Sequence, residues 1–360
     1  MKMGAGRTAF LVALLAFFIY YLPYFGLYFN SLTPFKIVHT DAWKKIMDFR
    51  RSFRPIREPT PLPEIDFKDI TYEKFMQMTA GLSRPIAIRN AIAAVNELGD
   101  VNFWLEKYGD SIVNCVDMDT DLYRACTVRE LIDYNMKQGR NIYSRTNHQI
   151  LYENPELIEK LTNNVTYWIG NEPLYEIFIG FESGGSPLHA AFGVNLFKQI
   201  TGHKKWTLWA PAELPFMDLH LSDDAASLLA IGGRVTYSGT EWLKRTNRYE
   251  VILNAGDMLF NPCMWMHIVE NVDPDNTASL IIGSPERHFG VKYGWKTSPY
   301  ITTHLIMKKI LIKLYQKVNG ITAEKSAVDF LPINNVENAR LFDEYIRKRA
   351  KELAGGAVLN

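Results

Sequence analysis

Between residues 167 and 283 the chain consists of short apolar or alternating runs separated by Gly, Pro, Asn and Asp. Such runs are typical of β-strands, and turn residues at this spacing are typical of a β-sandwich or barrel. The clearest runs are LYEIFIGFE, GVNLFKQITG, KKWTLWAP, EVILNAGDMLFNP and ASLIIGS. We therefore expect a β core over about 167–285.

Helical patterns flank this core on both sides. TYEKFMQMTAGL and TVRELIDYNMKQG precede it, and HLIMKKILIKLYQKV and VENARLFDEYIRKRAKEL follow it. Thr127 followed by Glu130 predicts a capping box at the start of the second helix. The last two patterns predict a C-terminal helical region, 291–360, which covers the barrel, touches a membrane surface or forms a homodimer. The fold class is thus mainly β with flanking helices.

The N-terminal run from Thr8 to Leu32 contains no charged residue. It is long enough to cross a bilayer as a helix, because about 20 apolar residues suffice. Lys2 and Arg7 precede it, as in a signal peptide, but no small-residue cleavage motif follows. We therefore predict an uncleaved transmembrane anchor over 1–33, with a cleaved signal peptide or a buried core helix as the alternatives.

The orientation of this anchor is not settled by the sequence. Basic residues are more numerous after the run than before it, which favours a cytosolic C-terminal domain. Asn164-Val165-Thr166 is a glycosylation acceptor sequence, which matters only in a lumen. We expect a single-pass protein of an endomembrane, with the side of the membrane left open.

Proline dominates the segment after the anchor. RRSFRPIREPTPLPEIDF contains Pro55, Pro59, Pro61 and Pro63, a composition typical of extended, semi-rigid chain. We predict a basic, Pro-rich stem over 34–64 rather than packed structure. The globular domain is then expected over 65–290.

The charge balance and the cysteines exclude some classes of protein. A formal net charge of +1, from 40 basic and 39 acidic residues, argues against nucleic acid as a partner. The three cysteines show no CxxC spacing, so neither a zinc site nor a disulfide framework is indicated. A single bridge between Cys115 and Cys126 stays open.

Two histidines lie in strand-like segments that are expected to face the barrel interior. His189 lies in HAAFGVNLFKQ and His267 lies in GDMLFNPCMWMHIVENV. Two inward histidines on separate strands can hold one metal ion. In one continuous strand, alternate residues share a face, so the inward set of the first segment is predicted to be His189, Ala191, Gly193, Asn195, Phe197 and Gln199.

These segments carry a family resemblance. PLHAAFGVNLFKQITGHKKWTLWAP and GDMLFNPCMWMHIVENV resemble the Jumonji-C-like cupin family (cupin-8 type) of Fe(II)- and 2-oxoglutarate-dependent oxygenases. The likeness extends upstream through SRPIAIRNAI and YGDSIVNCVD and covers roughly 65–287. It implies a double-stranded β-helix, also called a jelly-roll or cupin core, in the domain 65–290.

The resemblance also implies a ligand set. The family holds iron with a His-x-Asp/Glu pair and a distal histidine; His189 and His267 match the two histidines, whereas Ala191 stands at the carboxylate position. Lys204 matches the lysine that pairs with the far carboxylate of 2-oxoglutarate. Asn195 and Ser186 match polar positions near this co-substrate.

The alanine at position 191 allows three interpretations. Another residue or water completes the metal shell, with Glu182 and His288 as the nearest candidates by sequence. Alternatively, the barrel is a non-catalytic binding module that has lost full metal coordination. In the third, a halide fills the gap, as in 2-oxoglutarate-dependent halogenases of a related superfamily, which have a small residue at this position.

We expect a membrane-anchored Fe(II)/2-oxoglutarate-dependent oxidoreductase-like protein that hydroxylates or halogenates an unknown substrate. Membrane attachment is compatible with a small-molecule, lipid or protein substrate. The long insertion at 218–248, between two predicted inner strands, is the expected rim or lid of the site.

Overall fold

The structure is a computed structural model, which describes a large part of the 360-residue chain. The described residues are 41–92, 96–118, 123–170, 173–181, 184–217, 219–221, 227–230, 241–272, 280–289, 291–298, parts of 302–318, and 333–356.

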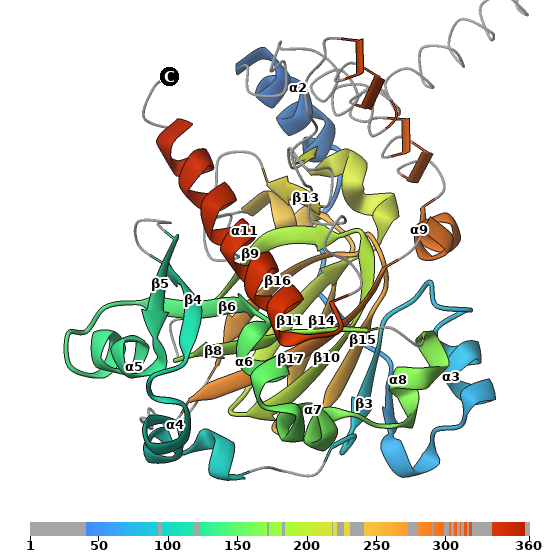
Figure 1. The fold of residues 1–360 in the computed structure, drawn as a ribbon. Helices are drawn as coiled ribbons and strands as arrows, with labels where there is room; N and C mark the ends of the chain where they lie inside the picture. Colours follow the sequence, from blue (N-terminus) through green and yellow to red (C-terminus); the bar gives the residue numbers. More distant parts are fainter. Residues whose placement is uncertain are drawn as a thin grey trace, which may run out of the picture.

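Two β-sheets form the centre of the molecule (Figure 1). The seven-stranded sheet has the order β1 (Thr60–Pro61), β14 (Tyr249–Leu253), β11 (Lys204–Trp209), β16 (Met266–Asn271), β9 (Gly185–Ala191), β13 (Ser227–Ala230) and β12 (Leu219–Leu221). The ten-stranded sheet has the order β2 (Glu64–Asp66), β3 (Ile86–Arg89), β15 (Met258–Asn261), β10 (Gly193–Thr201), β17 (Ile281–Phe289), β8 (Ile177–Gly180), β6 (Ile142–Asn147), β4 (Ile112–Asp117) and β5 (Tyr123–Thr127), while β7 (Leu174–Tyr175) pairs with β17. The predicted β core is confirmed.

Aromatic side chains from the two sheets meet in the interior between them. Phe197 of β10 packs edge-on against Trp206 of β11, with ring centroids 4.8 Å apart. Tyr143 and Phe178 of the ten-stranded sheet join Val269 of the other sheet in the same buried cluster. Because side chains alternate along a strand, this cluster identifies the inward positions of each strand.

The predicted continuous strand through His189 and Asn195 is wrong. The chain bends at Phe192, so that β9 belongs to the seven-stranded sheet and β10 to the ten-stranded sheet. At this bend the backbone of Gly193 lies close to Phe289, where a β-carbon would come within 3.0 Å of the ring. The bend places the two halves of the motif on different sheets.

Helices surround the sheets. They are α2 (Asp41–Ser52), α3 (Tyr72–Met78), α4 (Val101–Tyr108), α5 (Val128–Met136), α6 (Gln149–Glu153), α7 (Pro155–Leu161), α8 (Asn164–Ile169), α9 (Val291–Thr297) and α11 (Val336–Gly356), with 3-10 turns at Phe67–Asp69, Asn96–Gly99, Pro211–Phe216 and Glu241–Arg245. Leu151 and Leu157, from α6 and α7, pack with Ile177 and Ile282 on the outer face of the ten-stranded sheet. Helix α11 contacts α6 and β5 (Figure 1). The C-terminal helix therefore covers the barrel, one of the alternatives the sequence allowed.

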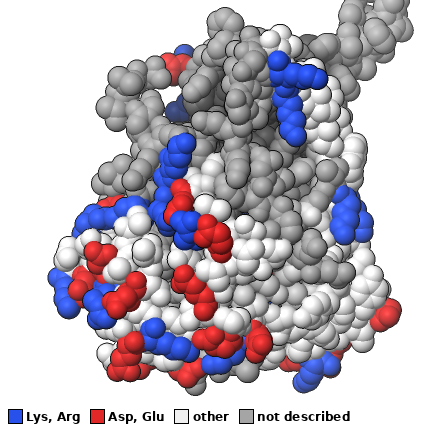
Figure 2. Space-filling model, in the orientation of Figure 1, with Lys and Arg blue, Asp and Glu red and all other residues white. Residues whose placement is uncertain are grey.

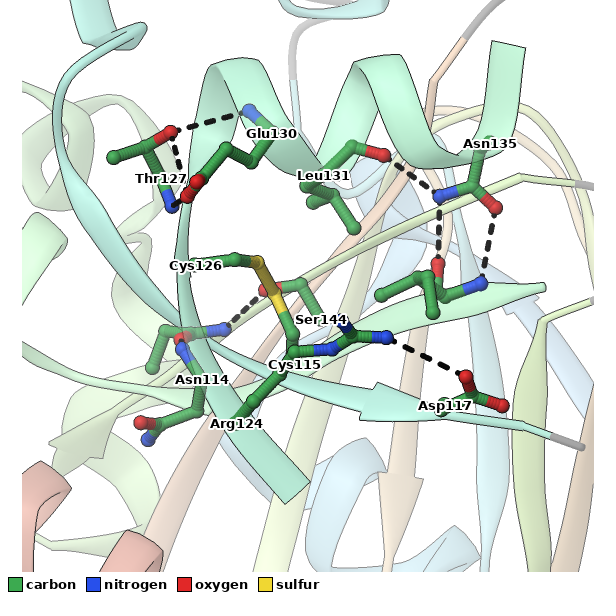
Figure 3. The surroundings of a disulfide bond; sticks show 12 residues. Asn114, Cys115, Asp117, Arg124, Cys126, Thr127, Glu130, Leu131, Asn135 and Ser144 are labelled. Carbon is green, nitrogen blue, oxygen red and sulfur yellow. Dashed lines mark hydrogen bonds and ion pairs between the residues drawn. A yellow bond between two sulfur atoms is a disulfide. The ribbon is translucent and has the colours of Figure 1, made fainter. Parts of the chain in front are cut away.

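Helix α5 begins with the predicted capping box (Figure 3). The Thr127 side chain accepts a hydrogen bond from the Glu130 backbone, and the Glu130 carboxylate accepts one from the Thr127 backbone. Just before the helix, a disulfide joins Cys115 of β4 to Cys126 of β5, whose Cα atoms are 6.2 Å apart. The bridge that the sequence left open is thus present, and it closes the β4–β5 hairpin.

Part of the expected stem is packed structure. Arg51 is buried, and Arg54 forms two hydrogen bonds with the buried Glu213 at 2.5 and 3.1 Å. Further on, β1 pairs in parallel with β14 at the edge of the seven-stranded sheet, and Leu62 joins the interior cluster. Proline is tolerated here because an edge strand needs fewer backbone donors than a central one. An extended, unpacked stem is therefore wrong for residues 51–62.

Several predicted segments lie wholly or partly outside the described residues. The run from Thr8 to Leu32 is among them, and within the described ranges no helix is long and apolar enough to span a bilayer. The insertion at 218–248 is described only in pieces. Its strands β12 and β13 extend the seven-stranded sheet beside β9, with Leu229 opposite His189 and Ser227 opposite Ala191.

Candidate active site

His189 and His267 meet inside the barrel. They are Cα partners on the neighbouring antiparallel strands β9 and β16, and their ring centroids are 4.2 Å apart. Trp206 stacks on the other side of His267 at 5.1 Å. This tryptophan forms a wall of the site. The predicted convergence of the two histidines is present.

Each imidazole is oriented by a backbone carbonyl two residues earlier. His189 Nδ1 lies 2.7 Å from the Pro187 oxygen, and His267 Nδ1 lies 3.0 Å from the Trp265 oxygen. Because a carbonyl only accepts, each Nδ1 carries the hydrogen and each Nε2 keeps its lone pair. Fixing the tautomer in this way is what histidine ligands of metal ions require.

Both imidazoles are held neutral. Burial, and to a smaller extent the charge of Arg287, lower the pKa of His189 to about 4. Burial also lowers the pKa of His267, as does its neighbour His189. Two neutral imidazoles with free Nε2 atoms are ready to act as ligands over the physiological pH range.

The structure offers no third ligand at this point. Ala191 follows His189 on β9, and within the described ranges no group of three His, Cys, Asp or Glu is arranged to hold a metal ion. Of the two candidates for completing the shell, Glu182 lies outside the described residues. His288 is on the opposite face of the ten-stranded sheet, where it contacts Glu286 at 2.7 Å, so this candidate is wrong.

Lys204 is fully buried in the interior, as the sequence predicted. Its Nζ donates a hydrogen bond to the Tyr143 hydroxyl at 2.9 Å and lies 5.4 and 5.8 Å from the ring centroids of Phe197 and Phe178. No carboxylate of the described residues forms an ion pair with it. Burial therefore lowers the pKa of Lys204 to about 7. The next residue, Lys205, instead pairs with Glu250 at 3.0 Å.

Tyr143 was missed by the sequence analysis. It lies on β6, 61 residues before Lys204, in the alternating run IYSRTN. This run was not among those interpreted as strands, and nothing in it indicated that Tyr143 would face Lys204. Together the ammonium and phenol groups form a polar end of an otherwise aromatic pocket, suited to a ligand carboxylate.

Two amide side chains line the wall between these groups. Asn195 of β10 is the Cα partner of Asn261 of β15, and the Asn261 amide lies 3.2 Å from His267 Nδ1. Both are buried. Because His267 Nδ1 carries the hydrogen, the Asn261 amide presents its oxygen to that nitrogen as an acceptor, whereas the Asn195 Oδ1 has no hydrogen-bond partner in the described part of the chain. Buried polar atoms are seldom left unpaired, so the Asn195 oxygen indicates a ligand or solvent position.

Ser186 lies at the other end of β9. It is the Cα partner of the interior residue Val269, and the pairing shifts register between this pair and the His189–His267 pair. Residues three apart on a regular strand point to opposite faces of the sheet. Here a β-bulge adds one residue on one strand, so Ser186 and His189 both lie opposite inward positions. All six predicted site positions thus lie on the strands that line one interior.

Comparisons with known proteins agree with this geometry. The sequence profile of the cupin-like domain family matches residues 124–282. The tRNA wybutosine-synthesizing protein 5 of Danio rerio is 31% identical over 147 residues, which are 40% of this chain and 40% of that protein. The protein of the same name from Gallus gallus is 24% identical over 234 residues, 61% of this chain and 69% of that protein.

A third relative, the Jumonji C domain-containing protein 5 of Drosophila melanogaster, is 24% identical over 238 residues, 61% of this chain and 59% of that protein. The matched part of the chain therefore spans less than two thirds of the length of the Danio and Drosophila relatives. The likeness is one of domain type.

The residues present fit both a metal ion and 2-oxoglutarate. Two neutral imidazoles with free Nε2 atoms supply two ligands, and Ala191 leaves space beside them. A buried lysine without a carboxylate partner suits the far carboxylate of a dicarboxylate. The unpaired oxygen of Asn195 lies in the wall between the two ends.

Proposed function

Because this chain contains a cupin-like domain of the Jumonji C type, we propose that it is an Fe(II)- and 2-oxoglutarate-dependent oxidoreductase. One observation carries the proposal. A pair of neutral histidines with both Nε2 atoms free shares a closed interior with a buried lysine that has no carboxylate partner among the described residues.

Each residue has a defined task in this proposal. His189 and His267 hold the iron through Nε2, while Pro187 and Trp265 keep their rings in place. Lys204 and Tyr143 bind the far carboxylate of 2-oxoglutarate, and Lys204 takes up a proton when its pKa is restored by that charge. Phe197, Phe178 and Trp206 exclude water from the pocket. The bound iron supplies the oxidative chemistry with molecular oxygen.

Two reactions are compatible with the vacant ligand position at Ala191, depending on what fills it. If water or hydroxide fills it, the expected reaction is hydroxylation; if a halide fills it, the expected reaction is halogenation. A chloride would restore the single negative charge that an aspartate would bring. The second candidate function is a non-catalytic binding module, which is favoured by the presence of only two ligands among the residues that the structure describes.

Binding experiments on the full chain separate these functions. The full chain is needed because Arg51, Arg54 and Leu62 pack against the barrel, so that a truncation near residue 60 would expose it. Under anaerobic conditions, we expect Fe(II) and 2-oxoglutarate to give a metal-to-ligand absorption band. A shift of this band with chloride or bromide supports a halide position, and failure to bind either Fe(II) or 2-oxoglutarate would reject the oxidoreductase.

We also propose that the run Thr8–Leu32 anchors the protein in an endomembrane. Its lack of charge over a bilayer-spanning length supports this. The full-length protein should then stay in the membrane pellet after alkaline carbonate extraction, and its recovery in the supernatant would reject the anchor.

The substrate is proposed to be other than nucleic acid, although the names of two relatives refer to tRNA. The net charge of +1 and the intermingled basic and acidic side chains on the face shown in Figure 2 support this. A small molecule, a lipid or a protein remains as the substrate class. Homodimer formation through the C-terminal helices is a further proposal, testable by sedimentation in detergent.

A further inference from the structure

A buried chain of alternating charges runs from the C-terminal helix towards the histidine pair. Asp343 of α11 lies 2.6 Å from His148 Nδ1 and accepts backbone hydrogen bonds from His148 and Gln149 at 3.0 Å. On the other side of the imidazole, His148 Nε2 lies 3.3 Å from Glu176. The same Glu176 oxygen lies 3.0 Å from Arg287 Nε.

The two central groups, His148 and Glu176, are charged near neutral pH. Burial opposes the charged form of His148, but Asp343 and Glu176 outweigh it and raise its pKa to about 9. Burial also opposes the charged form of Glu176, but Arg287 and His148 keep its pKa below the usual range. The side chains of Asp343, His148 and Glu176 are at most 5% exposed. Since buried ions are often no more stable than apolar residues of similar size, stability alone does not explain the chain.

The chain ends at an arginine that faces the site. Arg287 is the Cα partner of Asn195 on the inward face of β17, the face on which Gly283 abuts Phe197. Its Nε lies 3.0 Å from the Glu176 carboxylate as an ion pair without a hydrogen bond, and its Nη groups have no partner in the described part of the chain. Its side chain is 16% exposed. Its charge also acts on both site histidines, whose pKa values it helps to lower.

We propose that Arg287 binds an anionic group of the substrate beside the histidine pair. The ion pair with Glu176 leaves the terminal Nη donors of the planar guanidinium available as a fork, which suits a carboxylate or a phosphate. This rests on the proposed function, because it names the substrate class of the same site. We assign Asp343 the role of a positioning residue, acting on Arg287 through His148 and Glu176. Helix α11 is then a part of the site and not only a cover.

The arginine is tested by 19F NMR titration of the full chain with trifluoroacetate, a carboxylate probe, and with fluorophosphate, a phosphate probe. Arg287→Met should weaken binding of the preferred probe by about tenfold or more, and Arg287→Lys should weaken it less. The matched control is Arg54→Met, since Arg54 is 17% exposed and also pairs with a buried glutamate. An unchanged dissociation constant in Arg287→Met would overturn the proposal, and the probe binding would then be assigned to Lys204.

The positioning role needs a second comparison. Asp343→Asn removes the charge and should weaken probe binding by roughly three- to tenfold. Phe342→Leu loosens the same helix without changing charge, because Phe342 packs edge-on against His148 at 4.8 Å. Thermal unfolding of both variants measures how far the helix is loosened. If Phe342→Leu weakens probe binding as much as Asp343→Asn at an equal loss of Tm, Asp343 only docks the helix and the positioning role is wrong.

The titration requires neither iron nor 2-oxoglutarate, so the two proposals fail separately. A wild-type protein that binds Fe(II) and 2-oxoglutarate but shows no Arg287-dependent probe binding would overturn the anion site alone. Arg287-dependent probe binding without binding of Fe(II) or 2-oxoglutarate would support the anion site and reject the proposed oxidoreductase function. The tighter probe identifies whether the anionic group is a carboxylate or a phosphate.

Discussion

Two buried lysines have different surroundings: Lys198 lies on the outer face of the ten-stranded sheet, and Lys204 lies on the inner face of the seven-stranded sheet. On the outer face, Lys198 lies 2.7 Å from Glu286, which also accepts hydrogen bonds from Thr166 and contacts His288, each at 2.7 Å. In the interior, the partners of Lys204 among the described residues are the Tyr143 hydroxyl and three aromatic rings. The outer cluster contains its own anion, whereas the described part of the inner one does not. The difference distinguishes a structural ion pair from a ligand site.

The same contrast holds for the histidines. His288 faces a carboxylate, while His189 and His267 face backbone carbonyls and keep their Nε2 atoms free. Lys198 and His288, on the ten-stranded sheet, therefore serve as outer controls for the inner lysine and histidines of the seven-stranded sheet. The predictions use these pairs.

The largest expected difference is between the two lysines. Lys204→Met should weaken 2-oxoglutarate binding by about 100-fold or more, because the ligand carboxylate loses its charged partner. It should also stabilise the fold by roughly 1–4 kcal/mol, because an unpaired buried amine is replaced by an apolar group. Isothermal titration and chemical unfolding measure the two effects.

Lys198→Met is expected to do the reverse. It leaves Glu286 buried without its ammonium partner and should cost roughly 3–5 kcal/mol of stability, with 2-oxoglutarate affinity unchanged. Lys205→Met, which alters a half-buried pair with Glu250, should change neither quantity much. Loss of 2-oxoglutarate affinity in Lys205→Met would mean that the inward face of β11 is misassigned.

Next in size is the effect on the metal. His267→Ala should reduce Fe(II) or Co(II) affinity by about 100-fold or more, because one of two protein ligands is lost. His288→Gln, the outer control, should leave metal affinity unchanged while lowering Tm through its contact with Glu286. Anaerobic Co(II) titration followed by visible absorption checks both. Equal metal affinities in the two variants would show that the histidine pair is not the metal site.

Restoring a carboxylate should have a smaller, opposite effect. Ala191→Asp should tighten metal binding by about 10- to 100-fold and abolish any spectral response to chloride, since the carboxylate takes the vacant position. The comparison is a halide titration of the wild type and the variant. Weaker metal binding in Ala191→Asp would indicate that another residue already completes the shell.

The two ends of the site should also differ in pH dependence. The pKa of Lys204 in the free protein is lowered to about 7, so above pH 7 the lysine must take up a proton to pair with the ligand. The affinity for 2-oxoglutarate should be flat below pH 7 and fall by up to about tenfold per pH unit above it. The pKa of His189 is lowered to about 4, so metal affinity should not change from this source between pH 6 and 8. A 2-oxoglutarate affinity that is flat from pH 7 to pH 9 would contradict the lowered lysine pKa.

The smallest effect at the site is expected from the disulfide. Replacing Cys115 and Cys126 by serine should lower stability by about 3 kcal/mol, as expected for a loop closed over 11 residues. Binding of the metal and of 2-oxoglutarate should not change, because the bridge joins β4 to β5 at the edge of the ten-stranded sheet. Reducing and non-reducing thermal melts of the wild type give an independent measurement.

Sequence patterns located the inner residues individually. His189, Lys204 and His267 were found because each lies in a strand-like run within a recognisable motif, and the alternation of side chains predicted their inward direction. The pattern failed at Phe192, because alternation gives no sign of a chain crossing from one sheet to the other. The prediction of an unpacked stem from its prolines also failed at Pro61, because an edge strand accepts a proline that a central strand would not.

What the sequence determined by itself was local. It specified the strand and helix periodicities, the Thr127–Glu130 cap, and the alanine that leaves the histidine pair without a carboxylate.

The tertiary structure decided which charges are paired. Lys198 has Glu286 from a strand 88 residues away, Lys204 has Tyr143 from 61 residues away, and Asp343 reaches His148 across 195 residues. Backbone propensities act between near neighbours, whereas the state of a buried charge depends on whichever groups the fold brings within a few ångströms.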